Sequence, residues 1–171
     1  MEVLGEQVEI RIAAHPAYLC VVRAAVRKLA EILGVAEETI DSVTLAMEEA
    51  LANVIRHSYG GPCDRPIIVK VGRTALKEAA GVGLEVVIRD FGRAVDPATI
   101  KSRSLEDVRP GGLGVHIIHS VMDEVEYSCP LAGGMQLRMV KRIGQAPGDG
   151  VTRGGTCHGS ANPGEKRLWR N

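Results

Sequence analysis

The chain has 171 residues, of which 45% are apolar, and this length and composition suit one globular domain with a sizeable core. Lysine plus arginine and aspartate plus glutamate number 21 each, so the net charge predicts neither direct nucleic-acid binding nor attraction to an anionic membrane. Aromatic residues make up only 3%, which argues against base-stacking platforms for single-stranded nucleic acid.

The first predicted element is a strand over residues 7–13, where apolar and polar residues alternate before the break at His15-Pro16. Apolar residues at helical spacing then predict a helix over residues 16–33, which Gly34 stops. A second and longer helix is expected from about residue 35 to residue 54, before a glycine-rich turn.

β-branched runs predict two central strands at residues 66–71 and 84–89. The second strand ends at an Asp-Phe-Gly turn and is followed by a loop of about twenty residues, a length that usually signals function or disorder. A short apolar helix over residues 115–122 comes next, and alternating runs at 124–128 and 135–141 predict a terminal hairpin.

This order separates helices from strands and therefore predicts an α+β two-layer sandwich rather than a doubly wound parallel sheet. Residues 1–143 are expected to form one domain. Residues 144–171 are rich in glycine, proline and polar side chains, which predicts a disordered tail. Neither a dinucleotide fingerprint, a phosphate loop nor a His-Arg-Asp catalytic loop is present, so any nucleotide chemistry needs another scaffold.

The amino-terminal residues form neither a basic leader nor an apolar run, and no segment approaches the ~20 apolar residues of a membrane span. We therefore expect a cytoplasmic protein. Four cysteines lie far apart without Cys-x-x-Cys spacing, which predicts reduced thiols rather than a zinc site or a disulfide framework. His116 and His119 stand three residues apart in a predicted helix, and we interpret them as packing or surface residues.

Three polar residues, Glu49, Asn53 and His57, follow one another at intervals of four on the second predicted helix and so share one face of it. At the edge of a cleft, the carboxylate could accept a proton from a hydroxyl nucleophile. The amide oxygen one turn away could bind Mg²⁺. A solvated helix face would give the same pattern, so the stripe alone leaves both interpretations open.

Two glycine-containing segments could complete a nucleotide site. Asp90 follows a buried strand and Gly92 permits a tight turn, so the carboxylate could accept a hydrogen bond from the amine of adenine. An ordinary strand-ending turn is the alternative. Residues 111–114, Gly-Gly-Leu-Gly, precede a helix whose amino-terminal amides could receive phosphate, or they form a flexible loop end.

Three segments resemble, in their order along the chain, the nucleotide-binding motifs of the GHKL ATPases. They are VTLAMEEALANVIRHSYGG, VIRDFGRAVDP and GGLGVHIIHSVMDEVEY. Over residues 15–127 the chain resembles more narrowly the bacterial anti-sigma factor serine kinases. The resemblance implies the two-layer GHKL (Bergerat) fold, in which about three helices cover one face of a mixed, mainly antiparallel sheet.

By this resemblance Glu49 is the expected catalytic base, and Asn53 is the expected Mg²⁺ ligand. Asp90 is the expected adenine-recognition acid. The other residues expected at the ATP site are Gly92, Arg109, Gly112, Leu113 and Gly114.

One departure from the family pattern is Ala94, which stands where a second glycine is common and could crowd the adenine side of the pocket. The loop over residues 93–110 would form a lid, whose cations could screen phosphate charge or simply be solvated: Lys101, Arg103 and Arg109. His57 is expected to have a packing or hydrogen-bonding role at the helix end. Glu48 is expected to point about 100° away from Glu49 on the helix.

The resemblance implies an ATP- and Mg²⁺-dependent protein serine kinase that phosphorylates an anti-sigma factor antagonist and sequesters a sigma factor. It also implies a homodimer with the first helix in its interface and Arg23 near the partner. One alternative is a nucleotide-binding partner switch without phosphotransfer, against which Glu49 and Asn53 argue. A histidine kinase catalytic domain is another, but we find no acceptor helix before residue 7, and gyrase-like ATPases would need a longer chain.

Overall fold

A computed structural model gives the structure of residues 7–76, 81–97, 100 and 113–144. The strands are β1 (Gln7–Ala14), β2 (Cys63–Ala75), β3 (Val82–Arg89), β4 (Glu124–Ser128) and β5 (Gln136–Gly144). The helical elements are the 3₁₀ turn η1 (Pro16–Tyr18), α1 (Leu19–Ile32), α2 (Glu37–Asn53), the π-helical turn η2 (Val54–Ser58) and α3 (Leu113–Val121).

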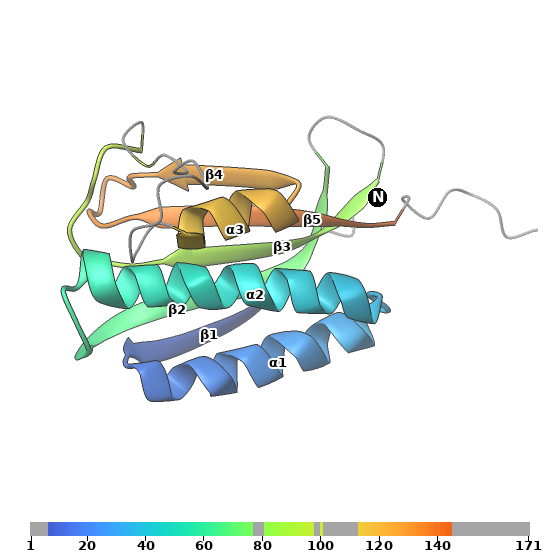
Figure 1. The fold of residues 1–171 in the computed structure, drawn as a ribbon, viewed down its shortest axis with the longest axis horizontal. Coiled ribbons are helices and arrows are strands. Elements are labelled where there is room, and N and C mark those ends of the chain that lie inside the picture. Colours follow the sequence, from blue (N-terminus) through green and yellow to red (C-terminus); the bar gives the residue numbers. More distant parts are fainter. Residues whose placement is uncertain (1–6, 77–80, 98–99, 101–112, 145–171) are drawn as a thin grey trace, which may run out of the picture.

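The five strands form one sheet in the order β1-β2-β3-β5-β4, and each of its four pairings is antiparallel. Helices α1, α2 and α3 lie on one face of this sheet (Figure 1). The predicted α+β two-layer sandwich with three helices on one face is therefore confirmed. No helix in the described part of the chain combines the length and the apolar character needed to cross a bilayer.

The core lies between the helices and the sheet because each strand turns alternate apolar side chains toward the helical layer. In β3 these side chains are Leu84, Val86 and Ile88, all at most 1% exposed. Helix α2 packs against them with a wide apolar face whose fully buried members are Val43, Ala46, Met47 and Leu51. This continuous packing holds α2 rigidly over the centre of the sheet.

Local signals define where α1 ends and where α2 begins. Gly34 adopts a positive φ of 73°, and the next amide donates back to the carbonyl of Ala30, which closes the helix in the way a glycine cap does. Helix α2 begins three residues after Gly34 with Glu37 and Glu38, whose negative charges favour a helix amino terminus.

Most predicted elements are present, but several of their boundaries differ from the prediction, and two of the differences have a clear physical cause. Strand β2 begins at Cys63, before Pro66, because the pairing register with β1 shifts opposite this proline and so accommodates it. The second helix changes from α to π geometry after Asn53, so that the amide of Tyr59 donates to the carbonyl of Val54 at 3.1 Å. Gly144, the first residue of the predicted tail, is the last residue of β5, and the rest of that tail lies outside the described residues.

Candidate functional site

A cavity of about 430 Å³ lies between the helical layer and the sheet. Its polar lining comes from α2, from η2 and from the turn that follows β3, whereas α3, β4 and β5 supply much of the apolar lining. The polar side chains are Glu49, Asn53, Arg56, His57, Ser58 and Asp90. The volume falls within the usual range of small-molecule sites, ~300–1,000 Å³.

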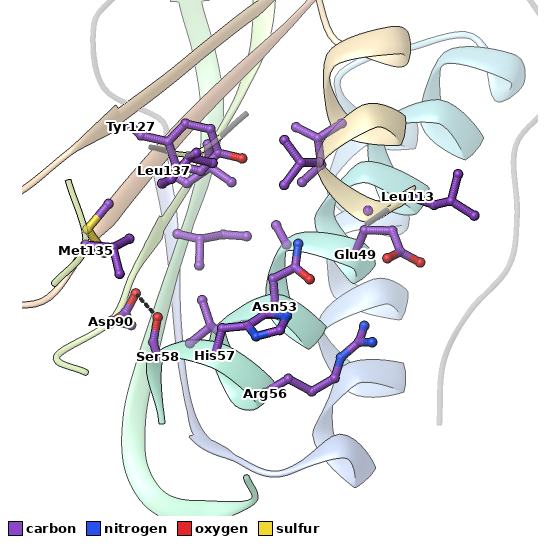
Figure 2. A pocket seen from close by; sticks show the side chains of 18 residues that line it. Glu49, Asn53, Arg56, His57, Ser58, Asp90, Leu113, Tyr127, Met135 and Leu137 are labelled. Atoms are coloured by element: carbon purple, nitrogen blue, oxygen red, sulfur yellow. Dashed lines mark hydrogen bonds between the residues drawn. The ribbon is translucent and has the colours of Figure 1, made fainter. Parts of the chain in front are cut away.

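Glu49 and Asn53 lie one turn apart on α2 and meet the start of α3 at Gly114. A methyl group on Gly114 would come within 2.8 Å of the Glu49 carboxylate and 3.1 Å of the Asn53 amide nitrogen. Only glycine lets the α3 backbone approach both side chains so closely. In Figure 2 Glu49 lies beside Leu113, with Asn53 nearer the middle of the cavity.

Asp90 lies toward the other end of the cavity in Figure 2 and is only 2% exposed. One carboxylate oxygen accepts the backbone N–H of Gly92 at 2.8 Å, and the other accepts the hydroxyl of Ser58 at 3.5 Å. These bonds orient the carboxylate of a turn that the end of β3 places at the cavity wall. Because a carboxylate can accept more bonds than these two, Asp90 keeps acceptor capacity for a ligand.

The turn after β3 packs directly against Ser58. A methyl group on Gly92 would lie 2.4 Å from the carbonyl oxygen of Ser58, and the amide of Arg93 donates to that same oxygen at 3.0 Å. Gly92 is therefore needed for close packing between this turn and η2.

Burial raises the pKa of Asp90 above its ordinary value, while the amide of Gly92 and the charge of Arg89 oppose that shift. The cavity thus has a carboxyl group in a dry environment at one end and a second carboxyl group, Glu49, at the other. Among the described residues Arg56 is the one lysine or arginine that lines it.

The structure brings five of the predicted site residues to one cavity: Glu49, Asn53, Asp90, Leu113 and Gly114. Gly92 lies beside it and bonds to Asp90. Arg109 and Gly112 lie outside the described residues, as do Lys101 and Arg103 of the predicted lid. Their roles, and those of the residues at the cavity, stay predictions.

The structure also places three further residues that the sequence analysis discussed, Glu48, His57 and Ala94. Glu48 points away from the cavity and forms an ion pair with Arg23 of α1 at 3.1 Å. His57 is exposed on η2 and lines the cavity. Ala94 is exposed, whereas its neighbour Val95 lines the cavity. Val95 rather than Ala94 lines the cavity, and the effect of Ala94 on nucleotide affinity stays a prediction.

Sequence reasoning did not identify Ser58 and Arg56 as site residues. Both belong to η2, where π geometry departs from the helical spacing used to place Glu49 and Asn53. Ser58 has a small hydroxyl side chain that packs against the Asp-Phe-Gly turn after β3, but the two segments are 32 residues apart, so the sequence does not show that they meet.

A model of the histidine kinase-like ATPase domain family matches residues 12–141. The chain is 25% identical over 130 residues to the serine-protein kinase RsbW of Bacillus subtilis, a match that covers 71% of this chain and 77% of the relative. It is 26% identical over 148 residues to RsbW of Oceanobacillus iheyensis, which covers 82% and 89% of the two chains.

Two solved structures have the same fold. One contains the RsbU and RsbW domains of Rv1364c from Mycobacterium tuberculosis and matches with a TM-score of 0.56 at 16% identity, over 83% of this chain and 34% of that chain. The other is the SiaB–SiaC complex from Pseudomonas aeruginosa, with a TM-score of 0.58 at 17% identity over 78% and 88%. The predicted resemblance to GHKL ATPases and their serine kinase branch is confirmed. Since the family model covers well over half of its residues, the chain belongs to the histidine kinase-like ATPase domain family.

Proposed function

We propose that this chain is an ATP-dependent protein serine kinase that phosphorylates a small anti-sigma factor antagonist. When that antagonist is absent or already phosphorylated, the chain sequesters a sigma factor. The enzyme class agrees with the relatives, which are named serine-protein kinases. The observation that carries the proposal is that Glu49, Asn53 and Asp90 line one cavity of nucleotide-compatible size.

At one end of the cavity Asp90 would accept a hydrogen bond from the exocyclic amine of adenine. Its orientation by Gly92 and Ser58 prepares it for a single geometry. The apolar side chains Met135, Leu137 and Tyr127 line the cavity wall and suit a planar base.

At the other end Glu49 would act as the general base. It would take the proton of the substrate serine as the hydroxyl oxygen forms a bond to the γ-phosphorus of ATP, the bond from that phosphorus to the β–γ bridging oxygen breaks, and ADP leaves. The side chain is half-buried on a rigid helix, so its carboxylate is held at the cavity rather than free in solvent.

The site residues also fit Mg²⁺, because the side-chain oxygen of Asn53 is a hard ligand and Gly114 keeps side-chain atoms out of the space beside it. Bound Mg²⁺ would neutralise part of the charge on the phosphates. Arg56 would add a positive charge at the same cavity.

The proposal includes a cytoplasmic homodimer in which α1 contributes to the interface. Exposed apolar side chains on α1, Val21 at 56% and Ile32 at 72%, support an interface there. Arg23 has a half-exposed side chain on the same helix and would face a protein partner in spite of its ion pair with Glu48.

The test combines the protein with labelled ATP, Mg²⁺ and purified single-domain antagonists from the source organism, and measures phosphoserine on the antagonist. Glu49→Gln should lower transfer by about 10²-fold or more, the usual contribution of a general base, while ATP binding is kept. Asn53→Ala should weaken Mg²⁺-dependent ATP binding and transfer together. Glu38→Gln, an exposed carboxylate in the first turn of the same helix, is the control and should change neither.

Transfer at the wild-type rate by Glu49→Gln would remove Glu49 from the role of base. ATP binding without transfer to any antagonist would favour the binding-only partner switch. Absence of ATP binding by the wild-type protein would contradict the proposal as a whole.

A further inference from the structure

Tyr59, the residue that follows η2, connects two segments that are distant in the sequence. Its hydroxyl accepts the backbone N–H of Phe91 at 2.9 Å and donates to the carbonyl oxygen of Pro66 at 2.6 Å. The ring is half-buried against the core. A single phenol thus ties the turn after β3 to the start of β2.

Arg65 completes this arrangement from β2. Its guanidinium lies 4.6 Å from the centre of the Tyr59 ring and donates to the carbonyl oxygen of Phe91. The N–H and the C=O of Phe91 are therefore both bound by side chains, one from Tyr59 and one from Arg65. We call these two residues the Tyr59–Arg65 clamp.

Phe91 stands between Asp90 and Gly92, so the clamp acts on the backbone that aims the Asp90 carboxylate. The Gly92 amide that donates to Asp90 belongs to the same peptide unit as the Phe91 carbonyl that Arg65 binds. Rotation of this peptide unit would move the amide away from the carboxylate. The dense contact of Gly92 with Ser58 leaves little space for any other position of the turn.

The clamp also connects, through the protein chain, the helix at one end of the cavity with the turn at the other end. The Tyr59 amide bonds to the carbonyl of Val54, the residue directly after Asn53. The π turn thus joins the helix that carries Asn53 to the phenol that holds the turn of Asp90. No atom of the clamp lines the cavity, so its residues would act through Asp90.

We propose that Tyr59 and Arg65 are positioning residues that set the base specificity of the nucleotide site by holding the Asp90 turn in one conformation. This inference rests on the proposed function, in which Asp90 accepts a hydrogen bond from adenine. ATP gains from a fixed Asp90 because it offers the amine hydrogen. GTP presents a carbonyl oxygen at the corresponding ring position and gains nothing from it.

The first test is competitive binding of ATP and GTP to the full chain with Tyr59→Phe. This change keeps the ring under Arg65 but removes both hydrogen bonds of the hydroxyl. The preference for ATP over GTP should fall about fivefold to tenfold, the effect of one or two lost hydrogen bonds, through weaker ATP binding. Tyr18→Phe, at an exposed tyrosine at the end of η1, is the matched control and should keep the wild-type preference.

A double-mutant cycle separates positioning from a general structural effect. In an Asp90→Asn background the preference for ATP over GTP should already be narrowed. Because the clamp acts through that carboxylate, Tyr59→Phe should then cause no further change in the ratio of ATP to GTP affinity. An equal loss of preference with and without the Asp90 carboxylate would overturn the inference.

Arg65→Lys tests the clamp independently at an exposed position. A lysine keeps the charge but loses the planar group that stacks on Tyr59 while it donates to Phe91. We expect the ATP preference to fall several-fold, by about the value of one hydrogen bond. The control is Arg73→Lys, because Arg73 is also exposed and donates to a backbone carbonyl, that of Leu33 at 2.6 Å.

The outcomes distinguish this inference from the function on which it rests. If the wild-type protein prefers ATP and both clamp variants keep that preference, the inference is wrong and the proposed function stands. If the wild-type protein binds ATP and GTP equally, the role of Asp90 in base recognition is wrong, and the inference falls with it.

Discussion

At the scale of single residues, Asp90 combines a charge with a position that water hardly reaches. It is 2% exposed and its hydrogen bonds come from one amide and one hydroxyl, so burial is the larger influence and raises its pKa. A group whose ionised form is disfavoured in the folded state lowers the stability of that state once it ionises. The position of Asp90 is thus better explained by ligand recognition than by a contribution to the stability of the fold.

The raised pKa of Asp90 predicts how the stability of the folded protein depends on pH. The folded protein binds the Asp90 proton more tightly than the unfolded chain, so the stabilisation from this group is complete below its unfolded pKa. That contribution is lost as pH rises through the raised pKa of the folded state. Asp90→Asn should therefore be more stable than wild type at pH 7, and the difference should shrink as pH falls toward 4.

Urea unfolding of both nucleotide-free proteins at several pH values measures this difference. The Asn variant can keep the bond from the Gly92 amide, because its side-chain oxygen is still an acceptor. A constant difference across the pH range would contradict the interpretation that the ionised carboxylate is the cause.

At the scale of elements, the sequence predicted those parts of the fold that depend on local periodicity. The β-branched run in β3 and the apolar repeat in α2 correspond to an observed strand and an observed helix, and both elements contribute fully buried side chains to the core. Spacing on α2 also placed Glu49 and Asn53 at one cavity. The π geometry of η2 could not be predicted, since the residues after Asn53 are equally compatible with a further α-turn.

The contacts around Asp90 could not be predicted for a different reason. Ser58 and Tyr59 reach the turn after β3 only because the sheet brings β2 and β3 together, and no local pattern records that approach. Tertiary packing therefore determined the surroundings of the site, whereas sequence motifs indicated its central residues.

A cluster of three charged side chains joins strands β3, β4 and β5 of the sheet. The guanidinium of Arg138 donates to Glu85 at 2.6 Å and to Glu124 at 2.8 Å, and the three side chains are 17%, 12% and 24% exposed. Burial opposes the charge of Arg138, but the bonds to the two carboxylates outweigh it and raise its pKa. Arg138 therefore links three strands through largely buried charges.

Arg138→Met should destabilise the protein by roughly 2 kcal/mol, because it removes the cation between two poorly solvated carboxylates. The matched control is Lys70→Met, which removes the cation of an exposed cross-strand pair with Glu9. That change should cost less than about 1 kcal/mol. Chemical unfolding of both variants measures the two effects, and equal effects would show that burial of the Arg138 cluster does not matter.

At the scale of the whole molecule, helices cover one face of the sheet, and the cavity is lined from both layers. The two proposed ends of the nucleotide site are attached to the two layers that enclose one core, Asn53 through helix α2 and Asp90 through strand β3. The described part of the chain therefore contains a core and a site that depend on each other. We infer that residues up to Gly144 suffice for folding and for nucleotide binding.

The strand β5 sets the point at which the chain can be shortened. Gly144 pairs with Val82, and Ile143 packs against the core, so both residues belong to the sheet. The residues beyond Gly144 contain few large apolar side chains apart from Leu168 and Trp169, and so offer little surface for burial. A chain that ends at Gly144 should keep the thermal midpoint and the ATP affinity of the full chain.

A chain that ends at Arg142 is the contrasting variant, because it loses the buried part of Ile143 and the last pair of β5. It should be less stable by roughly 1–2 kcal/mol. Thermal unfolding and ATP titration of the three proteins measure these outcomes. A large loss of stability in the chain that ends at Gly144 would show that Leu168 or Trp169 packs on the core, and the domain boundary would then lie further along the chain.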